Sequence, residues 1–152
     1  MRSTLAALLV LVGCAPPSPA SVELAAAPAA PTGPTVTWHG MIRCDPIPGV
    51  ANFELRQLFD LMVAGGQATY ERAIRRADTS GDSGERERGG GPVAADGAVR
   101  LTGSASTANY SYDAEYSGRL SSNGAAHLVG VQHWRPRRAV PVDRACTIDL
   151  RR

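Results

Sequence analysis

The stretch YSYDAEYSGRL, residues Tyr110–Leu120, decides the predicted fold because its side chains alternate in kind at every step. One set of positions is apolar or glycine, while the intervening positions are polar or charged. The apolar set comprises Tyr110, Tyr112, Ala114, Tyr116, Gly118 and Leu120. A period of two is typical of a β-strand with one buried face. The pattern therefore predicts a strand whose tyrosines point into a core.

Comparable alternation surrounds this strand. The turn sequence Ser-Ser-Asn-Gly at 121–124 predicts a hairpin with a strand over 126–134, and Asp96-Gly97 predicts a turn within 93–101. Residues 36–44 and 146–150 alternate in the same way. Residues 53–63 and 68–74 flank Gly65-Gly66 as a further hairpin, although 53–63 also satisfies helical spacing.

These segments predict an all-β protein with one small antiparallel meander of seven or eight strands, closed or nearly closed like a barrel. Glycines within or at the ends of the apolar faces indicate the curvature that a curled sheet needs, at Gly40, Gly103, Gly118 and Gly130. A flat two-layer β-sandwich is the alternative architecture.

Two cysteines, Cys44 and Cys146, lie near the ends of this domain and fall on the inward side of their strands. Their pairing would close about a hundred residues of chain, which a loop-entropy model credits with up to about 4.7 kcal/mol. The third cysteine, Cys14, lies in the N-terminal segment and is considered below as a site of lipidation. If it is lipidated, two thiols remain, and an even number is expected in an oxidising compartment. We therefore predict a Cys44–Cys146 disulfide.

The N-terminus has the pattern of a signal peptide, in which Arg2 precedes an apolar run too short to span a bilayer. At its end, Leu11-Val12-Gly13-Cys14 resembles the lipobox of bacterial lipoproteins. The resemblance implies cleavage after Gly13, acylation of Cys14 and stable attachment to a membrane. It implies a cell-envelope location facing the periplasm or the surface, and Ala15 favours the outer over the inner membrane.

The chain accordingly divides into three parts. We predict a lipoprotein signal peptide at 1–13, a lipidated cysteine with a Pro/Ala-rich tether at 14–34, and a β-domain at 35–152. An extended tether of this length would reach about 60 Å from the membrane.

The net charge of +2 comes from sixteen arginines and no lysine, and it predicts no nucleic-acid partner. Near the C-terminus a basic excess faces only Asp143 and Asp149, and comprises Arg135, Arg137, Arg138, Arg144, Arg151 and Arg152. We interpret it as a solvated loop and tail, or alternatively as a docking patch for anionic lipid or an acidic partner. No phosphate-binding loop is present, so no cofactor is predicted.

Several segments resemble catalytic or metal sites without matching them. Gly81-Asp82-Ser83-Gly84 resembles the nucleophile segment of chymotrypsin-like proteases, but Glu85 replaces a glycine there. Asp78, Ser80 and Asp82 resemble a calcium loop, but Ser83 replaces its glycine. Three histidines face outward, and about 20 Å of strand separates His127 from His133. We therefore predict no metal site.

The charged, glycine-rich stretch 75–91 is predicted to be a mobile loop, or alternatively a recognition loop. The third histidine, His39, lies on the first predicted strand.

Three families supply resemblances. The motifs Trp38-x-Gly40, Tyr70-Glu71-Arg72 and Gly130-x-Gln132-x-Trp134 resemble small exported proteobacterial domains that have no assigned activity. Lipocalins carry an early Gly-x-Trp motif, which Trp38-x-Gly40 reverses. Ser106 to Tyr110 resembles the inhibitory segment of the membrane-bound lysozyme inhibitor family, with Thr107 in place of that family's glycine.

We predict a non-catalytic cell-envelope lipoprotein whose β-domain is a binding or structural module and not an enzyme. The alternatives are a periplasmic inhibitor of a cell-wall-degrading enzyme, and a lipocalin-like carrier of a small apolar ligand. Trp38, Tyr112, Tyr116 and Trp134 would line the cavity of a carrier or belong to the core. A filled interior would favour recognition of a protein at the surface.

Overall fold

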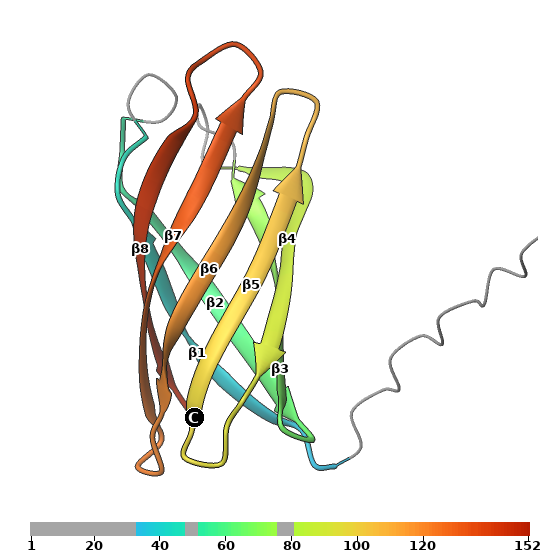
Figure 1. Cartoon of the computed structure of the whole chain (residues 1–152), viewed down its shortest axis with the longest axis vertical. Helices are drawn as coiled ribbons and strands as arrows, with labels where there is room; N and C mark the ends of the chain where they lie inside the picture. Colours follow the sequence, from blue (N-terminus) through green and yellow to red (C-terminus); the bar gives the residue numbers. More distant parts are fainter. Residues whose placement is uncertain (1–32, 48–51, 76–80) are drawn as a thin grey trace, which may run out of the picture.

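The computed structural model describes residues 33–47, 52–75 and 81–152, which form eight strands. The strands are β1 (Val36–Cys44), β2 (Leu55–Ala64), β3 (Gln67–Arg75), β4 (Asp82–Pro92), β5 (Ala98–Ser106), β6 (Tyr110–Leu120), β7 (Ala125–Pro136) and β8 (Val142–Arg151). Each pairs antiparallel with the next, and β1 pairs with β8, so the sheet closes into a barrel (Figure 1). The predicted all-β meander is confirmed, and the helical alternative for 53–63 is wrong. Within the described residues, no helix is long and apolar enough to cross a membrane.

The two ends of the barrel carry different connections (Figure 1). The lower end, as drawn, holds the turns at 65–66, 94–97 and 121–124, together with the start of β1 and the end of β8. The upper end holds the β5–β6 turn at 107–109 and the β7–β8 loop at 137–141. Gly65, Gly66, Gly97 and Gly124 have φ of 54°, 75°, 83° and 80°, a conformation that side-chain-bearing residues seldom adopt. The predicted turns at the lower end are therefore confirmed.

The glycines within the strands allow neighbouring backbones to approach closely, as predicted. A Cβ atom at Gly40 would lie 1.9 Å from the carbonyl oxygen of Asp149, and one at Gly130 would lie 2.0 Å from that of Glu115. At Gly103 the obstacle is a side chain, because a Cβ would lie 2.0 Å from the hydroxyl oxygen of Tyr70.

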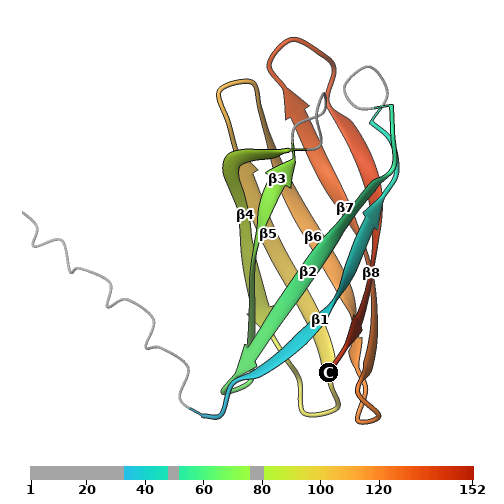
Figure 2. The same cartoon turned by 180° about the vertical axis from the view of Figure 1, so that it is seen from behind.

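The β3–β4 hairpin is only partly joined to the rest of the barrel. β3 and β4 pair along most of their length, but β2 and β3 are in register only over Met62–Ala64 and Gln67–Thr69. β4 and β5 are in register over Arg88–Gly90 and Thr102–Ser104. Above these points the hairpin diverges from β2, as Figure 2 shows. Side chains inside the barrel must therefore hold its upper part.

The stretch 75–91 is not the loop that the sequence predicts. Residues 76–80 lie outside the described residues, but Asp82–Pro92 forms β4. The prediction was wrong because the inward positions of this strand carry Glu87 and glycines, so the sequence lacks the apolar alternation of a half-buried strand. Polar residues can fill inward positions when they are hydrogen-bonded, and such a strand has no hydrophobic alternation.

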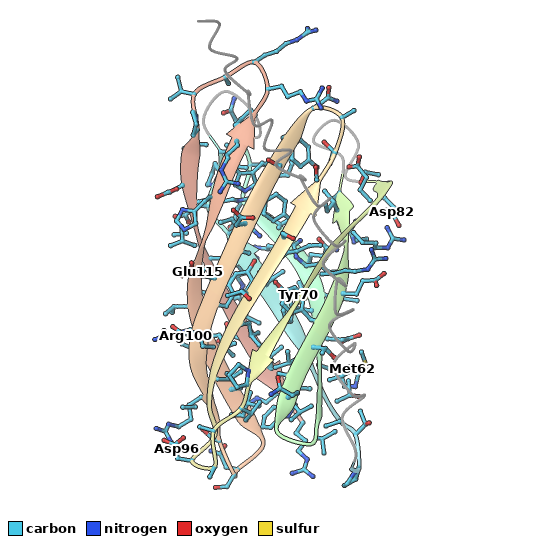
Figure 3. The ribbon with its side chains drawn as sticks, turned by 45° about the vertical axis from the view of Figure 1, so that its right-hand side comes forward. Met62, Tyr70, Asp82, Asp96, Arg100 and Glu115 are labelled. Atoms are coloured by element: carbon cyan, nitrogen blue, oxygen red, sulfur yellow. A yellow bond between two sulfur atoms is a disulfide. The ribbon has the colours of Figure 1, made fainter. Side chains whose placement is uncertain are left out.

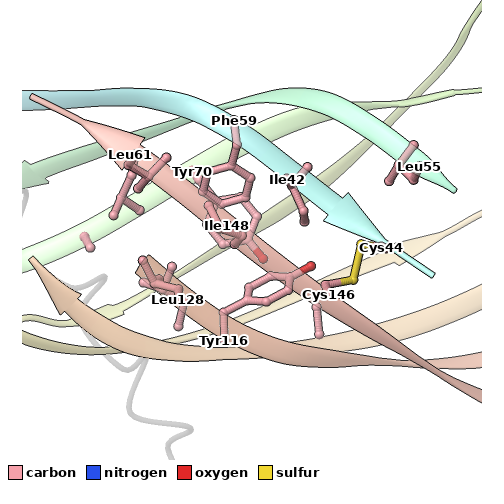
Figure 4. Close-up of a cluster of buried hydrophobic side chains, with 14 of the residues drawn as sticks. Ile42, Cys44, Leu55, Phe59, Leu61, Tyr70, Tyr116, Leu128, Cys146 and Ile148 are labelled. Carbon is pink, nitrogen blue, oxygen red and sulfur yellow. A yellow bond between two sulfur atoms is a disulfide. The ribbon is translucent and has the colours of Figure 1, made fainter. Parts of the chain in front are cut away.

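The lower half of the interior is aliphatic. Leu61, Leu101, Leu128 and Ile148 are fully buried there, and Phe59 packs on Tyr70 with ring centroids 4.7 Å apart. Figure 4 shows this ring group between Leu61 and Leu128 on one side and the disulfide on the other.

The predicted disulfide is confirmed. Cys44 and Cys146 are directly opposite each other in the β1–β8 pairing, with their Cα atoms 4.1 Å apart and an S–S bond of 2.06 Å. The bond therefore joins the first strand to the last where the barrel closes.

Candidate functional site

The upper half of the interior is built around one carboxylate, that of Glu87 on β4, which is 0% exposed. Its Oε1 accepts hydrogen bonds from the hydroxyl groups of Tyr70 at 2.7 Å and Tyr116 at 3.1 Å. Its Oε2 accepts one from the hydroxyl of Tyr112 at 2.7 Å and forms an ion pair with Arg72. Both oxygens are therefore satisfied from two other strands, β3 and β6, as a buried charge requires.

Arg72 connects this carboxylate to β2. Its Nη1 donates to Gln57 Oε1 at 3.1 Å, and its Nη2 donates to the Tyr112 hydroxyl at 3.3 Å. Gln57 in turn donates to the backbone oxygen of Ala73 at 2.7 Å. These bonds cross the β2–β3 junction at a level where the two strands are not in register. Side chains thus replace the missing backbone ladder.

Gln132 on β7 completes the group, which we call the Glu87 cluster: Gln57, Tyr70, Arg72, Glu87, Tyr112, Tyr116 and Gln132. Its amide nitrogen donates to the Tyr116 hydroxyl at 2.8 Å, and its amide oxygen accepts from Trp134 Nε1 at 3.1 Å. Trp134 also stacks on Tyr112, with ring centroids 4.4 Å apart. The cluster therefore links β2, β3, β4, β6 and β7.

Burial and charge raise the pKa values of the three tyrosines and of Arg72 in the cluster. Burial, and next the Glu87 carboxylate, raise the pKa values of Tyr70 and Tyr116 far above the usual value of a phenol. Burial also raises the pKa of Tyr112, where the Arg72 charge opposes the increase. For Arg72, burial alone would lower the pKa, but the Glu87 carboxylate outweighs it, so the pKa is raised. The raised pKa values keep the three phenols neutral and the Arg72 guanidinium charged near neutral pH.

A second arginine, Arg144 on β8, lies beside the cluster and is 5% exposed. Its Nε donates to the backbone oxygen of Asp45 at 2.5 Å. Burial, together with repulsion from Arg72, lowers the pKa of Arg144 to about 10. Among the described residues, the barrel interior therefore holds two buried guanidinium groups and one buried carboxylate.

The chemistry of the Glu87 cluster is suited to holding the barrel together. A general base needs a free lone pair and access to substrate, whereas both oxygens of Glu87 accept hydrogen bonds and are buried. The tyrosines cannot supply phenolate nucleophiles near neutral pH, because their pKa values are raised. The cluster occupies the centre of the barrel, where a carrier would hold its ligand.

The structure does not bring the four predicted aromatic residues together. Tyr112, Tyr116 and Trp134 belong to the upper half, with exposed fractions of 1%, 1% and 7%. Trp38 is near the start of β1, at the lower end, and is 6% exposed. Trp38 therefore lies apart from the other three aromatic side chains, at a cavity described next.

That cavity is open at the lower end, and we call it the lower mouth. It has a volume of about 590 Å³, and its apolar lining is formed by Val36, Trp38, Val63, Val93 and Leu120. Its rim carries Arg119, Arg152 and Asp96. Arg119 Nη2 pairs with Asp96 Oδ2 at 2.9 Å.

The basic residues near the C-terminus form no single patch. Arg144 is buried and Arg135 pairs with Asp113, whereas Arg137 and Arg138 are exposed in the upper β7–β8 loop. Arg151 and Arg152 are exposed at the opposite end.

The histidines lie apart on the outer wall, and each Nδ1 contacts an aspartate: His39 with Asp60 at 2.8 Å, His127 with Asp149 at 2.7 Å and His133 with Asp143 at 2.7 Å. Among the described residues, no group of three or more His, Cys, Asp or Glu side chains could hold a metal ion. Cys14, Asp78 and Ser80 lie outside the described residues.

The segment Ser106 to Tyr110 forms the exposed β5–β6 turn at the upper end. Thr107 orders it, because its Oγ1 accepts hydrogen bonds from the backbone nitrogens of Asn109 and Tyr110, both at 3.1 Å. The neighbouring β7–β8 loop is fixed against it by a 2.9 Å bond from Arg137 N to Asn109 O. Val140 in that loop is 82% exposed. These two connections form one ordered surface, which we call the upper surface.

Sequence reasoning missed Glu87, Arg72, Gln57 and Gln132 as partners. The sequence does contain a clue to this cluster. Arg72 falls on the same face of its segment as Tyr70 and Ile74, and an arginine that points into a core requires an acidic partner there. Comparisons with known proteins add no family, since no family model, no curated protein and no solved structure matches the chain.

Proposed function

We propose that this protein is a non-catalytic, lipid-anchored module of the cell envelope that binds a protein partner through the surface of its barrel. The observation that carries the proposal is the Glu87 cluster, which fills the upper interior with side chains that are already bonded to one another. A barrel whose interior is occupied offers its ends and its outer wall for recognition.

The upper surface supports recognition of a protein. A rigid hairpin tip loses little conformational freedom on binding, and the Thr107 bonds hold this one in place. Val140 supplies an exposed apolar side chain next to Arg137 and Arg138. Apolar and arginine side chains in one patch are typical of protein interfaces.

The proposed lipid anchor and membrane location rest on the N-terminal signal sequence. Cys14 follows the lipobox-like segment, and the described chain enters the barrel at Gly33, where a Cβ would lie 3.6 Å from Gly65 N in the lower β2–β3 turn. A tether attached there would leave the upper end pointing away from the membrane. We propose the outer membrane because Ala15 follows the cysteine.

A second candidate function is inhibition of a cell-wall-degrading enzyme. It is favoured by the position of Ser106 to Tyr110, since the segment that resembles the lysozyme inhibitors lies at an exposed, ordered tip. Added protein should then lower lysozyme activity, and Ser106→Ala with Tyr110→Ala should restore it. Unchanged activity at micromolar excess of the protein would remove this candidate.

A lipocalin-like carrier is the third candidate, and an eight-stranded barrel is compatible with it. Its ligand would have to use the lower mouth, because the Glu87 cluster fills the interior above.

Native mass spectrometry of the protein extracted from its own envelope tests these candidates together. The proposal expects a co-purifying protein that is lost when Val140→Asp and Arg138→Glu are introduced at the upper surface. Val129→Asp is a matched control, since Val129 is 51% exposed on the outer wall of β7. A retained small molecule with no protein would support the carrier and contradict surface recognition.

The anchor is tested separately by metabolic labelling with palmitate. The label should appear in the wild-type protein and be absent from Cys14→Ser. An unlabelled wild-type protein would contradict the proposed lipidation whatever the outcome for the partner.

A further inference from the structure

The lower mouth combines features that the Glu87 cluster and the upper surface do not explain. Part of its lining is apolar and opens to solvent, with half-buried Val36, Val63 and Val93 around Trp38. The exposed part of this lining is open to a partner that brings apolar groups to the opening. The character of that partner follows from the charges around the opening and from the place where the chain enters.

The charges around the lower mouth are mainly positive. Arg119 is neutralised by Asp96, but Arg151 and Arg152 are exposed and make no ion pair within the part of the chain that the structure describes. Arg100 is also exposed, on the wall above Asp96 (Figure 3), and likewise has no ion pair among the described residues. An apolar opening with surplus arginines is complementary to a lipid surface with anionic headgroups.

The entry point of the chain favours the same partner. Gly33 lies beside Gly65 at this end, so the predicted tether joins the barrel next to the mouth. Eighteen residues lie between Cys14 and Gly33, which keeps the lower end within tens of ångströms of an anchored lipid, at about 3.1 Å per residue if extended. Such attachment raises the effective concentration of the membrane at this face.

We infer that the lower mouth docks onto a bilayer surface that carries anionic headgroups. Arg151 and Arg152 bind headgroups, and the half-buried valines meet the boundary between headgroups and acyl chains, while Trp38, which is 6% exposed, lines the cavity behind them. The inference deepens the envelope function and rests on it for the presence of a membrane. Docking would hold the barrel upright with the upper surface directed away from the membrane.

The experiment uses the two tryptophans, which lie at opposite ends of the barrel. Protein purified from the envelope is added to vesicles of phosphatidylcholine, with or without phosphatidylglycerol, whose acyl chains carry bromine as a fluorescence quencher. Trp134→Phe leaves only Trp38 to report on the lower mouth. Trp38→Phe leaves only Trp134, which stacks on Tyr112 in the upper half.

The inference expects at least a twofold loss of Trp38 fluorescence in vesicles with phosphatidylglycerol, and little loss for Trp134. Arg151→Ala with Arg152→Ala should weaken docking by tenfold or more, on the order of 1 kcal/mol for each arginine. Arg137→Ala with Arg138→Ala removes the same charge at the upper end and should leave the quenching unchanged. If Trp134→Phe does not fold, total fluorescence of the wild-type protein serves, with the two arginine pairs as the comparison.

Three outcomes would overturn the inference. These are an unquenched Trp38 in phosphatidylglycerol vesicles, equal losses from both arginine pairs, and quenching by a free brominated fatty acid but not by vesicles. The last outcome would make the mouth a small-molecule site. Palmitate labelling reports on the anchor independently, so a failure of docking and a failure of anchoring are distinguishable.

Discussion

The lower half of the barrel interior is filled by aliphatic side chains such as Leu61 and Leu128, whereas the upper half contains Glu87, Arg72 and three tyrosines. Both halves are produced by the same inward alternation of strand residues. The aliphatic half gains stability from non-directional burial, which varies smoothly with the area removed from water. The polar half depends on individual bonds, and the loss of one leaves its partner buried and unsatisfied. The two halves should therefore respond differently to pH and to conservative substitution.

The largest difference is expected at alkaline pH. All four tyrosines have raised pKa values. Burial raises the pKa of Tyr110 to about 12. The pKa values of Tyr70, Tyr112 and Tyr116 are raised further. The stability from these shifts is fully present below the unfolded pKa of a phenol, near 10, and is lost as the pH rises above it. Each tyrosine contributes up to about 1.4 kcal/mol per pH unit in that range. The pKa of Arg144 is lowered to about 10, so this one group makes the folded state more stable as the pH rises above 10, opposite to the four tyrosines.

We therefore expect the barrel to unfold cooperatively above pH 10. In a stopped-flow jump to alkaline pH, the absorbance of tyrosinate should increase at the same rate as the β-sheet circular dichroism signal is lost. Phenolate that forms in the folded protein near pH 10, with its circular dichroism intact, would contradict the hydrogen-bonded cluster.

The next largest effect is expected from breaking the buried ion pair. Arg72→Met leaves Glu87 without its guanidinium and should lower the free energy of unfolding by about 3–5 kcal/mol. Adding Glu87→Gln should recover part of the loss, since an amide needs no counter-charge. Urea denaturation of the two variants checks this, and a double variant as unstable as the single one would contradict the pairing.

Removal of the disulfide is expected to have an effect of similar or smaller size. Cys44→Ala with Cys146→Ala should lower the free energy of unfolding by about 2–4 kcal/mol. The β1–β8 backbone pairing remains in this variant, so the circular dichroism spectrum should be unchanged. A barrel that loses its sheet signal in the double variant would show that the sulfur bridge is needed for closure.

The smallest effects are expected from conservative substitutions that remove one small group from either half of the interior. Tyr116→Phe removes one hydroxyl that Glu87 and Gln132 share and should cost about 1–3 kcal/mol. Ile148→Val removes one methylene from the aliphatic half and should cost about 0.5–1.5 kcal/mol. Urea midpoints at pH 7 measure both variants. An equal or reversed order would contradict the distinction between the halves.

The same contrast explains what the sequence predicts and what it does not. β6, β7 and the disulfide follow from apolar alternation, and the structure confirms them. β4 was missed because its inward Glu87 has no apolar signature, and the partners of Glu87 lie 15 to 45 residues away in the chain. Hydropathy reports burial only when the buried group is apolar. The upper half therefore becomes visible only once the strands are placed beside one another.

The lower mouth illustrates a second limit. Its lining comes from β1, β2, β6 and the turn after β4, and each contributes one or two apolar residues that look ordinary in their own segments. Only closure of the sheet collects them around one opening. The sequence predicts Trp38, with Tyr112 and Trp134, as either a cavity-lining or a core residue, but the separation of Trp38 from the other two follows only from the barrel register.

Closure between β1 and β8 also sets the order of events when the protein is made. The first strand to emerge has its partner among the last ten residues of the domain, so Cys44 must wait for almost the entire domain before it meets Cys146. A chain delivered gradually through a pore would therefore expose an unpaired edge and a lone thiol throughout its synthesis. Truncation of even the final strand would leave the nascent domain open to wrong sulfur partners and to association with other chains.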